Sequence, residues 1–284
     1  MSNQGLIEID NVIDNEMNTN LEEKGNYLLE IRTVQSPPFR CLIEALKEIL
    51  TDANMEFDDT GMKIIAMDAS HTVLVHLKLE SKNFESYHCP NKIVLGIGML
   101  NFFKLIKTLG NNDTLTLYIE SEDPNKLGIK IENGEKNSIT KYKLNLMDLP
   151  EESISVPPAT FESVITMPAI DFQKLCRDMH NIAEHLEIKS VGTQLIFNCK
   201  GDIGTAEHVI GENNSGMSFI KNNNPEDIIQ GIFALKHLVM FTKCTNLCNQ
   251  VEIYLKNDYP LIISYGVASL GTIKLCLAPQ CTDI

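Results

Sequence analysis

The chain has 284 residues, of which 43% are hydrophobic and 22% are charged, and its formal net charge at pH 7 is −14. This length allows one large domain or two of ordinary size, and we expect two. No apolar stretch approaches the roughly 18 to 20 residues of a membrane-spanning helix, and the N-terminus lacks the features of a secretory signal. We therefore expect a soluble, intracellular protein that binds no membrane. The acidic balance argues against nucleic-acid binding unless basic side chains cluster locally.

The first 26 residues form an acidic segment with six carboxylate side chains and one lysine, Lys24. Segments with high net charge and low hydrophobicity cannot bury enough apolar surface to fold. We predict that residues 1–26 are a disordered N-terminal extension.

From Tyr27 onward, short alternating apolar segments broken by turn residues predict an antiparallel, β-rich protein with four helices. The elements predicted in the first half are, in chain order, Tyr27–Thr33, the helix Phe39–Leu50, Met55–Asp58, Met62–Met67, Thr72–Leu79, Lys92–Leu95, the helix Leu100–Leu109, Thr114–Glu120, Leu127–Glu132 and Thr140–Met147. Those predicted in the second half are Phe161–Met167, the helix Ile170–Ala183, Leu186–Ile188, Thr193–Asn198, Gly204–Ile210, Ile228–Phe233, the helix Ala234–Lys243, Val251–Leu255, Leu261–Tyr265 and Thr272–Leu277.

The order helix, strands, helix, strands thus occurs twice, which predicts two similar domains. Between the halves lies a segment with three prolines, and proline favours extended backbone without ladder hydrogen bonds. We predict an α+β fold with domains at residues 27–147 and 161–284, joined by a connecting loop at 148–160.

Each predicted helix carries two basic residues spaced three or seven apart, which places them on one side of the helix. The pairs are Arg40 and Lys47, Lys104 and Lys107, Lys174 and Arg177, and Lys236 and Lys243. Acidic residues share two of these helices, namely Glu44, Glu48, Asp171 and Asp178. Solvated surface charge is the alternative for any one helix, but the recurrence on all four favours a common positive surface. Such a surface would hold phosphates without reading bases.

Several segments closely resemble the proliferating cell nuclear antigen (PCNA) family of DNA sliding clamps, in the family's order and at its spacing. They are GMKIIAMDASHTVLV at Gly61–Val75, YKLNLMDL at Tyr142–Leu149, LCRDM at Leu175–Met179, MFTKCT at Met240–Thr245 and LAP at Leu277–Pro279. The similarity extends from about Tyr27 to Pro279.

This resemblance implies the clamp fold, a homotrimeric ring lined by helices with sheets outside, and a processivity factor rather than an enzyme. No cofactor or metal is expected. The implied partners are double-stranded DNA without sequence preference, further copies of the chain, DNA polymerase, a clamp loader, and repair proteins with a PCNA-interacting motif. The eight basic residues would bind DNA from the ring lining. The implied location is the nucleus, or a viral replication compartment in the host cell if the chain is viral.

Subunits of this family pair edge strands, here Thr140–Met147 of one chain with Thr205–Ile210 of the next. The implied subunit interface contains Tyr142, Leu144, Ala206, His208 and Val209.

Partners of this family insert apolar and aromatic side chains of a short helical turn into a pocket on the clamp. Matching positions place the pocket at Met67, His71, Leu74, Ile154, Val156, Pro157, Phe161, Pro260, Cys276, Leu277, Ala278 and Pro279. Cys276 stands where the family commonly has an aromatic residue, so motif preference can differ.

Three alternatives remain open at this stage. The nearest is a subunit of a heterotrimeric checkpoint clamp. A metal-dependent hydrolase would start from Asp68 and His71 with His76 or His88. Eight scattered cysteines indicate reduced, buried thiols, with the alternative of a zinc site from the four cysteines at positions 244, 248, 276 and 281.

Overall fold

The computed structural model describes residues 26–150, 154, 158–213, 216–221 and 227–280. The predicted N-terminal extension, apart from Asn26, lies outside the described residues, as do Val156 and Pro157 of the predicted partner pocket. The described part contains eighteen strands, four α-helices and two short 3-10 helices, so the α+β prediction is confirmed.

The elements follow the predicted order. The first half contains β1 (Tyr27–Thr33), α2 (Ser36–Ile49), β2 (Asp52–Asp58), β3 (Gly61–Met67), β4 (Val73–Glu80), η1 (Ser81–Asn83), β5 (Ser86–His88), β6 (Ile93–Gly98), α3 (Met99–Ile106), β7 (Asp113–Glu120), β8 (Lys126–Asn133) and β9 (Ser138–Asn145). The second half contains β10 (Ser163–Pro168), α4 (Ala169–His180), β11 (His185–Val191), β12 (Gln194–Gly201), β13 (Gly204–Gly211), β14 (Ser218–Lys221), β15 (Ile228–Ala234), α5 (Leu235–Phe241), η2 (Thr242–Leu247), β16 (Gln250–Leu255), β17 (Leu261–Val267) and β18 (Gly271–Leu277). The longest described helix, α2, has 14 residues, and no described helix is both long and apolar enough to cross a membrane.

The fourth helix is shorter than predicted. The α-helical part ends at Phe241, and the chain continues as the 3-10 helix η2. Threonine hydroxyls explain the change, because Thr242 Oγ1 donates to the Val239 carbonyl and Thr245 Oγ1 to the Thr242 carbonyl, both at 2.7 Å. Such bonds satisfy carbonyls at the helix end and favour a tighter turn.

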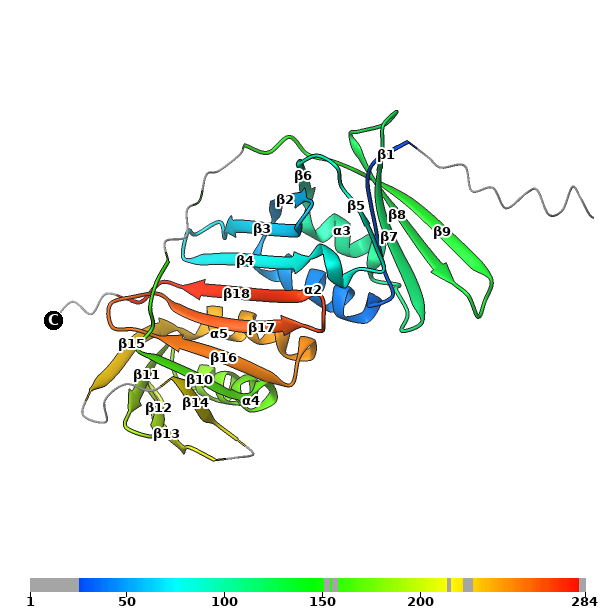
Figure 1. Ribbon diagram of the computed structural model, residues 1–284. Coiled ribbons are helices and arrows are strands. Elements are labelled where there is room, and N and C mark those ends of the chain that lie inside the picture. The colour runs from blue at the N-terminus through cyan, green and yellow to red at the C-terminus, as the bar shows by residue number, and fades with distance from the viewer. Residues whose placement is uncertain (1–25, 151–153, 155–157, 214–215, 222–226, 281–284) are drawn as a thin grey trace, which may run out of the picture.

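All strands pair antiparallel, in three sheets. The largest has the order β14-β10-β16-β17-β18-β4-β3-β2-β6, and the others are β5-β1-β7-β8-β9 and β13-β12-β11-β15. The largest sheet joins the two halves of the chain because β18 pairs with β4 along its whole length, from Gly271 opposite Leu79 to Leu277 opposite Val73. Figure 1 shows this junction at the centre of the molecule.

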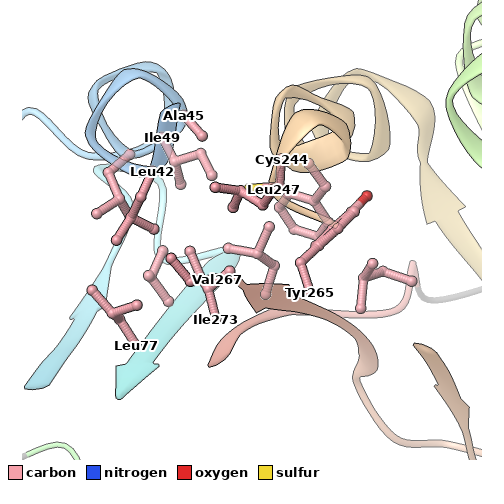
Figure 2. Close-up of a cluster of buried hydrophobic side chains, with 14 of the residues drawn as sticks. Leu42, Ala45, Ile49, Leu77, Cys244, Leu247, Tyr265, Val267 and Ile273 are labelled. Atoms are coloured by element: carbon pink, nitrogen blue, oxygen red, sulfur yellow. The ribbon is translucent and has the colours of Figure 1, made fainter. Parts of the chain in front are cut away.

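The four helices lie together behind the nine-stranded sheet (Figure 1). Figure 2 shows how Leu42 of α2 and Leu247 of η2 approach Val267 and Tyr265 of β17 from the helix side, where all four are buried. Burial of each such side chain contributes roughly 1.5–3 kcal/mol. The helices cover one face of this sheet. The opposite face points away from the helix layer, and we call it the outward face.

Candidate nucleic-acid interface and partner surface

Six of the eight predicted DNA-binding residues are exposed on the side of their helices that faces away from the sheet. On α3, for example, Phe102 and Ile106 are buried, whereas Lys104 and the adjoining Lys107 are exposed. The same holds on α4 and on the segment α5–η2 for Lys174, Arg177, Lys236 and Lys243. None of the six forms an ion pair within the part of the chain that the structure describes.

The remaining two, on α2, are half-buried and engaged within the protein. Arg40 Nη1 donates to the Leu109 carbonyl, just past the end of α3. The Lys47 ammonium donates to the Glu48 carboxylate and lies 5.0 Å from the centre of the Phe103 ring. The contacts to Leu109 and Phe103 hold α2 against α3 and leave Arg40 and Lys47 less available than the other six residues. DNA binding by all eight remains a prediction.

Acidic residues offset part of the positive charge on two helices. The exposed acids are Glu44 and Glu48 on α2, and Asp171 and Asp178 on α4. In contrast, α3 and α5–η2 contain no acidic residue. The hydrogen bond from Lys47, and to a smaller extent the charges of Lys47 and Lys243, hold the pKa of the Glu48 carboxyl below its ordinary value. Helix α2 packs directly against η2, although the two come from different halves of the chain.

The outward face of the nine-stranded sheet carries a row of apolar side chains. Across β3, β4, β18 and β17, Met67 is opposite Leu74, Leu74 opposite Cys276, and Cys276 opposite Ile262. All four are half-buried, and we call them the apolar row. Ile262 was not among the predicted pocket residues, and the sequence gives no alternation that would place it outward, because β17 begins with three apolar residues in a row.

Leu277 requires a correction. Its side chain is fully buried and lies opposite Val73, which is also buried, on the helix side of the sheet. Successive strand residues point to opposite faces, so Cys276 faces outward and Leu277 inward. The prediction that Leu277 contacts a partner motif is therefore wrong.

Five of the remaining predicted pocket residues flank one end of strands β4, β17, β18 and β10. They are His71, Phe161, Pro260, Ala278 and Pro279, of which only His71 is exposed, and Ile154 of the connecting loop is half-buried. The Ala278 N–H donates to the Thr72 carbonyl at 3.1 Å, which holds the segment after β18 beside the turn before β4. The Phe161 ring packs edge-on against Tyr254 and Tyr259, with centroids 5.4 and 5.7 Å apart.

The start of the connecting loop is fastened to the same sheet. The Met147 N–H donates to the Gly96 carbonyl at 2.8 Å, and Asn54 Nδ2 donates to the Pro150 carbonyl at 3.0 Å. Only glycine fits at position 96, because an added Cβ would lie 2.2 Å from the Met147 carbonyl oxygen. A hollow of about 350 Å³, partly lined by Met67 and Pro150, lies under this segment.

Asp68, the centre of the hydrolase alternative, holds the turn between β3 and β4. Its Oδ1 accepts the Thr72 and Val73 N–H groups, both at 2.8 Å, and its Oδ2 accepts the Ser70 hydroxyl. Burial would raise the pKa of the Asp68 carboxyl, but these hydrogen bonds outweigh it and lower that pKa below 3.8. His71 follows in the same turn with a φ of 53°. The carboxylate is thus occupied by backbone donors, which is the role of aspartate in many turns.

Replacement of Asp68 by alanine is expected to lower the free energy of unfolding by about 1–3 kcal/mol at pH 7, because the buried Val73 N–H and the half-buried Thr72 N–H lose their acceptor. Since the folded pKa lies below the ordinary 3.8, this contribution is complete above about pH 4 and is lost as the pH falls further. Urea unfolding at pH 7 and about pH 3 measures both effects. Exposed Asp59→Ala is the control; an equal loss there, or a pH-independent difference, contradicts the assignment.

The zinc alternative does not fit the placement of the cysteines. Cys244 is buried among the helix-side core residues (Figure 2), whereas Cys276 lies in the apolar row on the outward face. Within the described ranges, no group of three or more His, Cys, Asp and Glu side chains could hold a metal ion. Cys281 lies outside the described residues.

The predicted interface strands β9 and β13 are edge strands of eight residues each. The other sheet edges are shorter or covered. The Met147 N–H bonds to β6. On β15, the Ile232 carbonyl accepts the Gln280 N–H and the Ile228 carbonyl accepts the Asn257 side-chain amide. Within the described residues, no segment bonds the outer edge of β9 or β13. Long uncovered edges are prone to pair with another chain.

Each of these edge strands presents an apolar side toward the helix layer. On β9, Tyr142 and Leu144 lie opposite Ile129 and Leu127, which are buried. On β13, Ala206, His208 and Ile210 help line a hollow of about 420 Å³ next to α4. Val209 lies on the other side of β13 and is 46% exposed. The structure thus places all five predicted interface residues on the two open edges.

Comparison with known proteins gives concordant matches over both halves. The family models for the N-terminal and C-terminal domains of proliferating cell nuclear antigen match residues 28–153 and 155–280. The "Probable DNA polymerase sliding clamp 1" of Paramecium bursaria Chlorella virus 1 is 40% identical over 261 residues, which cover 90% of this chain and 98% of that protein. The proliferating cell nuclear antigen of Chaetomium thermophilum is 31% identical over 261 residues, which cover 90% of this chain and 99% of that protein.

Proposed function

We propose that this chain, which belongs to the proliferating cell nuclear antigen family of DNA sliding clamps, closes with two further copies into a ring around duplex DNA. The observation that carries the proposal is that one face of the molecule bears exposed, unpaired cations on the helices, while two separate sheets end in the open edges β9 and β13. The function is retention of a polymerase on DNA, and the chain performs no chemistry itself.

Ring closure follows from the difference between the two open edges. When β9 of one copy pairs with β13 of the next, each contact is head-to-tail, and head-to-tail contacts form a ring if the rotation closes. Exposed Lys141 on β9 and exposed Glu207 on β13 give the pair opposite charges. Three copies of a chain with two similar halves would give six similar units, with the helix layer inside.

In such a ring, Lys104, Lys107, Lys236 and Lys243 would provide the strongest positive lining, because their helices carry no acids. Cations contact phosphates without reading sequence, and the contact weakens with salt. Weak contact suffices, since a closed ring is held on DNA by topology.

On the outside of the ring, we propose that the apolar row and the residues at its end bind a short motif of partner proteins. A helical turn with apolar and aromatic side chains would cover the half-buried Leu74, Cys276 and Ile262. The partners would be DNA polymerase, a clamp loader and repair proteins. The chain would act where DNA is replicated, in the nucleus or in a viral replication compartment.

Topological retention can be tested on nicked circular DNA. After loading by a clamp loader, the ring is expected to stay with the circle during gel filtration at about 1 M salt, where ionic contacts are screened over about 3 Å. Cutting the circle once is expected to release it, because the ring can then slide off an end. Release from uncut circles at this salt, or retention on the linear DNA, would contradict encirclement.

A further inference from the structure

A cluster of basic side chains adjoins the apolar row on the outward face of the nine-stranded sheet. Lys63 of β3 is directly opposite Lys78 of β4, and His76 of β4 is directly opposite Lys274 of β18. Lys78 and Lys274 are diagonal neighbours in this register, and diagonal side chains are within reach of each other. We call these four residues the basic cluster.

Acidic side chains lie beside one end of the basic cluster, where Glu56 of β2 is directly opposite Lys63. The Lys63 ammonium is 3.6 Å from the Asp58 carboxylate. Neither Lys78 nor Lys274 forms an ion pair with any residue that the structure describes. The Lys274 ammonium lies 5.5 Å from the centre of the Tyr254 ring instead. The cluster is therefore a positive site on a chain whose net charge is −14.

The charges of the three lysines all act on one side chain, His76. Burial, and after it the charges of Lys274, Lys63 and Lys78, lower the pKa of the His76 imidazole. Like charges placed directly opposite each other destabilise a sheet. An anion bound among these side chains would remove that repulsion.

The cluster is aligned with the apolar row because both lie on the same strands. Leu74, His76 and Lys78 are alternate residues of β4, and Cys276 and Lys274 are alternate residues of β18. Alternate residues of a strand are about 7 Å apart. The cluster therefore begins about 7 Å from the apolar row and extends to about 13 Å, a distance that two to four residues of extended chain cover.

We propose that the partner motif of this clamp carries acidic residues two to four positions beyond its apolar anchors, and that the basic cluster binds them. The inference rests on the proposed function, which places the motif on the apolar row. A peptide fits better than a nucleic acid, because the cluster adjoins apolar side chains on one side and acids on others, with Glu56 of β2 opposite Lys63 and Glu80 beyond Lys78 on β4. The neighbouring outward positions on these strands are Ile65, Glu80 and Thr272.

The test uses the full chain and synthetic peptides in which a helical turn carries one aliphatic and two aromatic residues. Each peptide also carries a flank on one side of the turn, either N-terminal or C-terminal to it. The flank is rich in aspartate in one peptide, in serine in the second and in lysine in the third. Calorimetry at low salt is expected to give about three- to tenfold tighter binding for one aspartate-flanked peptide than for its serine counterpart, as expected of a few exposed ion pairs. The lysine flank should weaken binding, and about 1 M salt should remove the differences.

Variants identify the side chains responsible. Lys78→Glu with Lys274→Glu is expected to reverse the ranking, so that the lysine flank binds best, while the serine-flanked peptide keeps its affinity. The matched control, Lys136→Glu with Lys200→Glu, changes two exposed lysines away from the cluster and should preserve the ranking. Leu74→Glu, in the apolar row, should abolish binding of every peptide.

The outcomes separate this inference from the proposed function. If no peptide binds, the partner surface itself is refuted and the inference falls with it. If the serine-flanked peptide binds but aspartate brings no gain, or if the gain survives in Lys78→Glu with Lys274→Glu, only the inference is refuted. It is also refuted if single-stranded DNA binds more tightly than the aspartate-flanked peptide and loses that binding in the same double variant.

Discussion

Replacement of Tyr142 by aspartate is expected to separate the proposed trimer into monomers of 31.8 kDa. Tyr142 is half-buried on the edge strand β9, on the side that faces the helix layer. In the ring it would meet β13 of the next copy, where Ala206 and Ile210 are also half-buried. A carboxylate enclosed there loses water without gaining a partner, at a cost of at least about 3 kcal/mol. The subunit dissociation constant should therefore rise at least about 100-fold.

Light scattering over a range of concentrations measures this change directly. The unmodified chain should have three times the monomer mass, and Val34→Asp should keep that mass, because Val34 is exposed and lies on neither open edge. A Tyr142→Asp chain that remains trimeric would contradict the assigned interface. An unmodified chain that stays monomeric and assembles only with other clamp subunits would favour the heterotrimeric alternative.

Reversal of two charges on α3, Lys104→Glu with Lys107→Glu, is expected to reduce clamp-stimulated DNA synthesis on the order of tenfold at physiological salt. Both side chains are exposed, and neither has an ionic partner among the described residues. Each lost phosphate contact should also make the plot of the logarithm of the DNA-binding constant against the logarithm of salt concentration less steep, by about 0.9 in slope. Primer extension on a long template at several salt concentrations measures both effects.

The matched control is Lys82→Glu with Lys136→Glu, since neither residue lies on an α-helix. Stimulation by this control should equal that of the unmodified chain. Arg40→Glu should behave differently and lower the free energy of unfolding, because the Arg40 guanidinium is bonded to the Leu109 carbonyl. If the α3 variant stimulates synthesis normally with an unchanged salt dependence, the helix face does not contact DNA.

Local patterns were enough to predict most of the secondary structure. The strand Tyr27–Thr33 was predicted with the bounds that the structure has, because its alternation reflects burial on a single face. The strands β5 and β14 were missed, since three or four residues are too few to establish a period. The end of α5 was also wrong, because threonine hydroxyls bond to carbonyls there.

The candidate sites were predicted less completely than the fold. Helical spacing predicted basic residues on one side of each helix, but it could not reveal that Arg40 is bonded to Leu109, far along the chain. Motif similarity placed Leu277 and Cys276 together in the partner pocket, whereas the strand register puts their side chains on opposite faces. Contacts between distant segments therefore decided which members of each predicted set are available for binding.

Sequence patterns predicted the type of most elements and identified the family, because these depend on residues that are neighbours along the chain. The pairing of β4 with β18, which joins the two halves into one sheet, came from the tertiary structure. That pairing assembles the apolar row and the basic cluster from strands about two hundred residues apart. No local pattern encodes which strand edges meet, because the choice depends on the packing of the whole core.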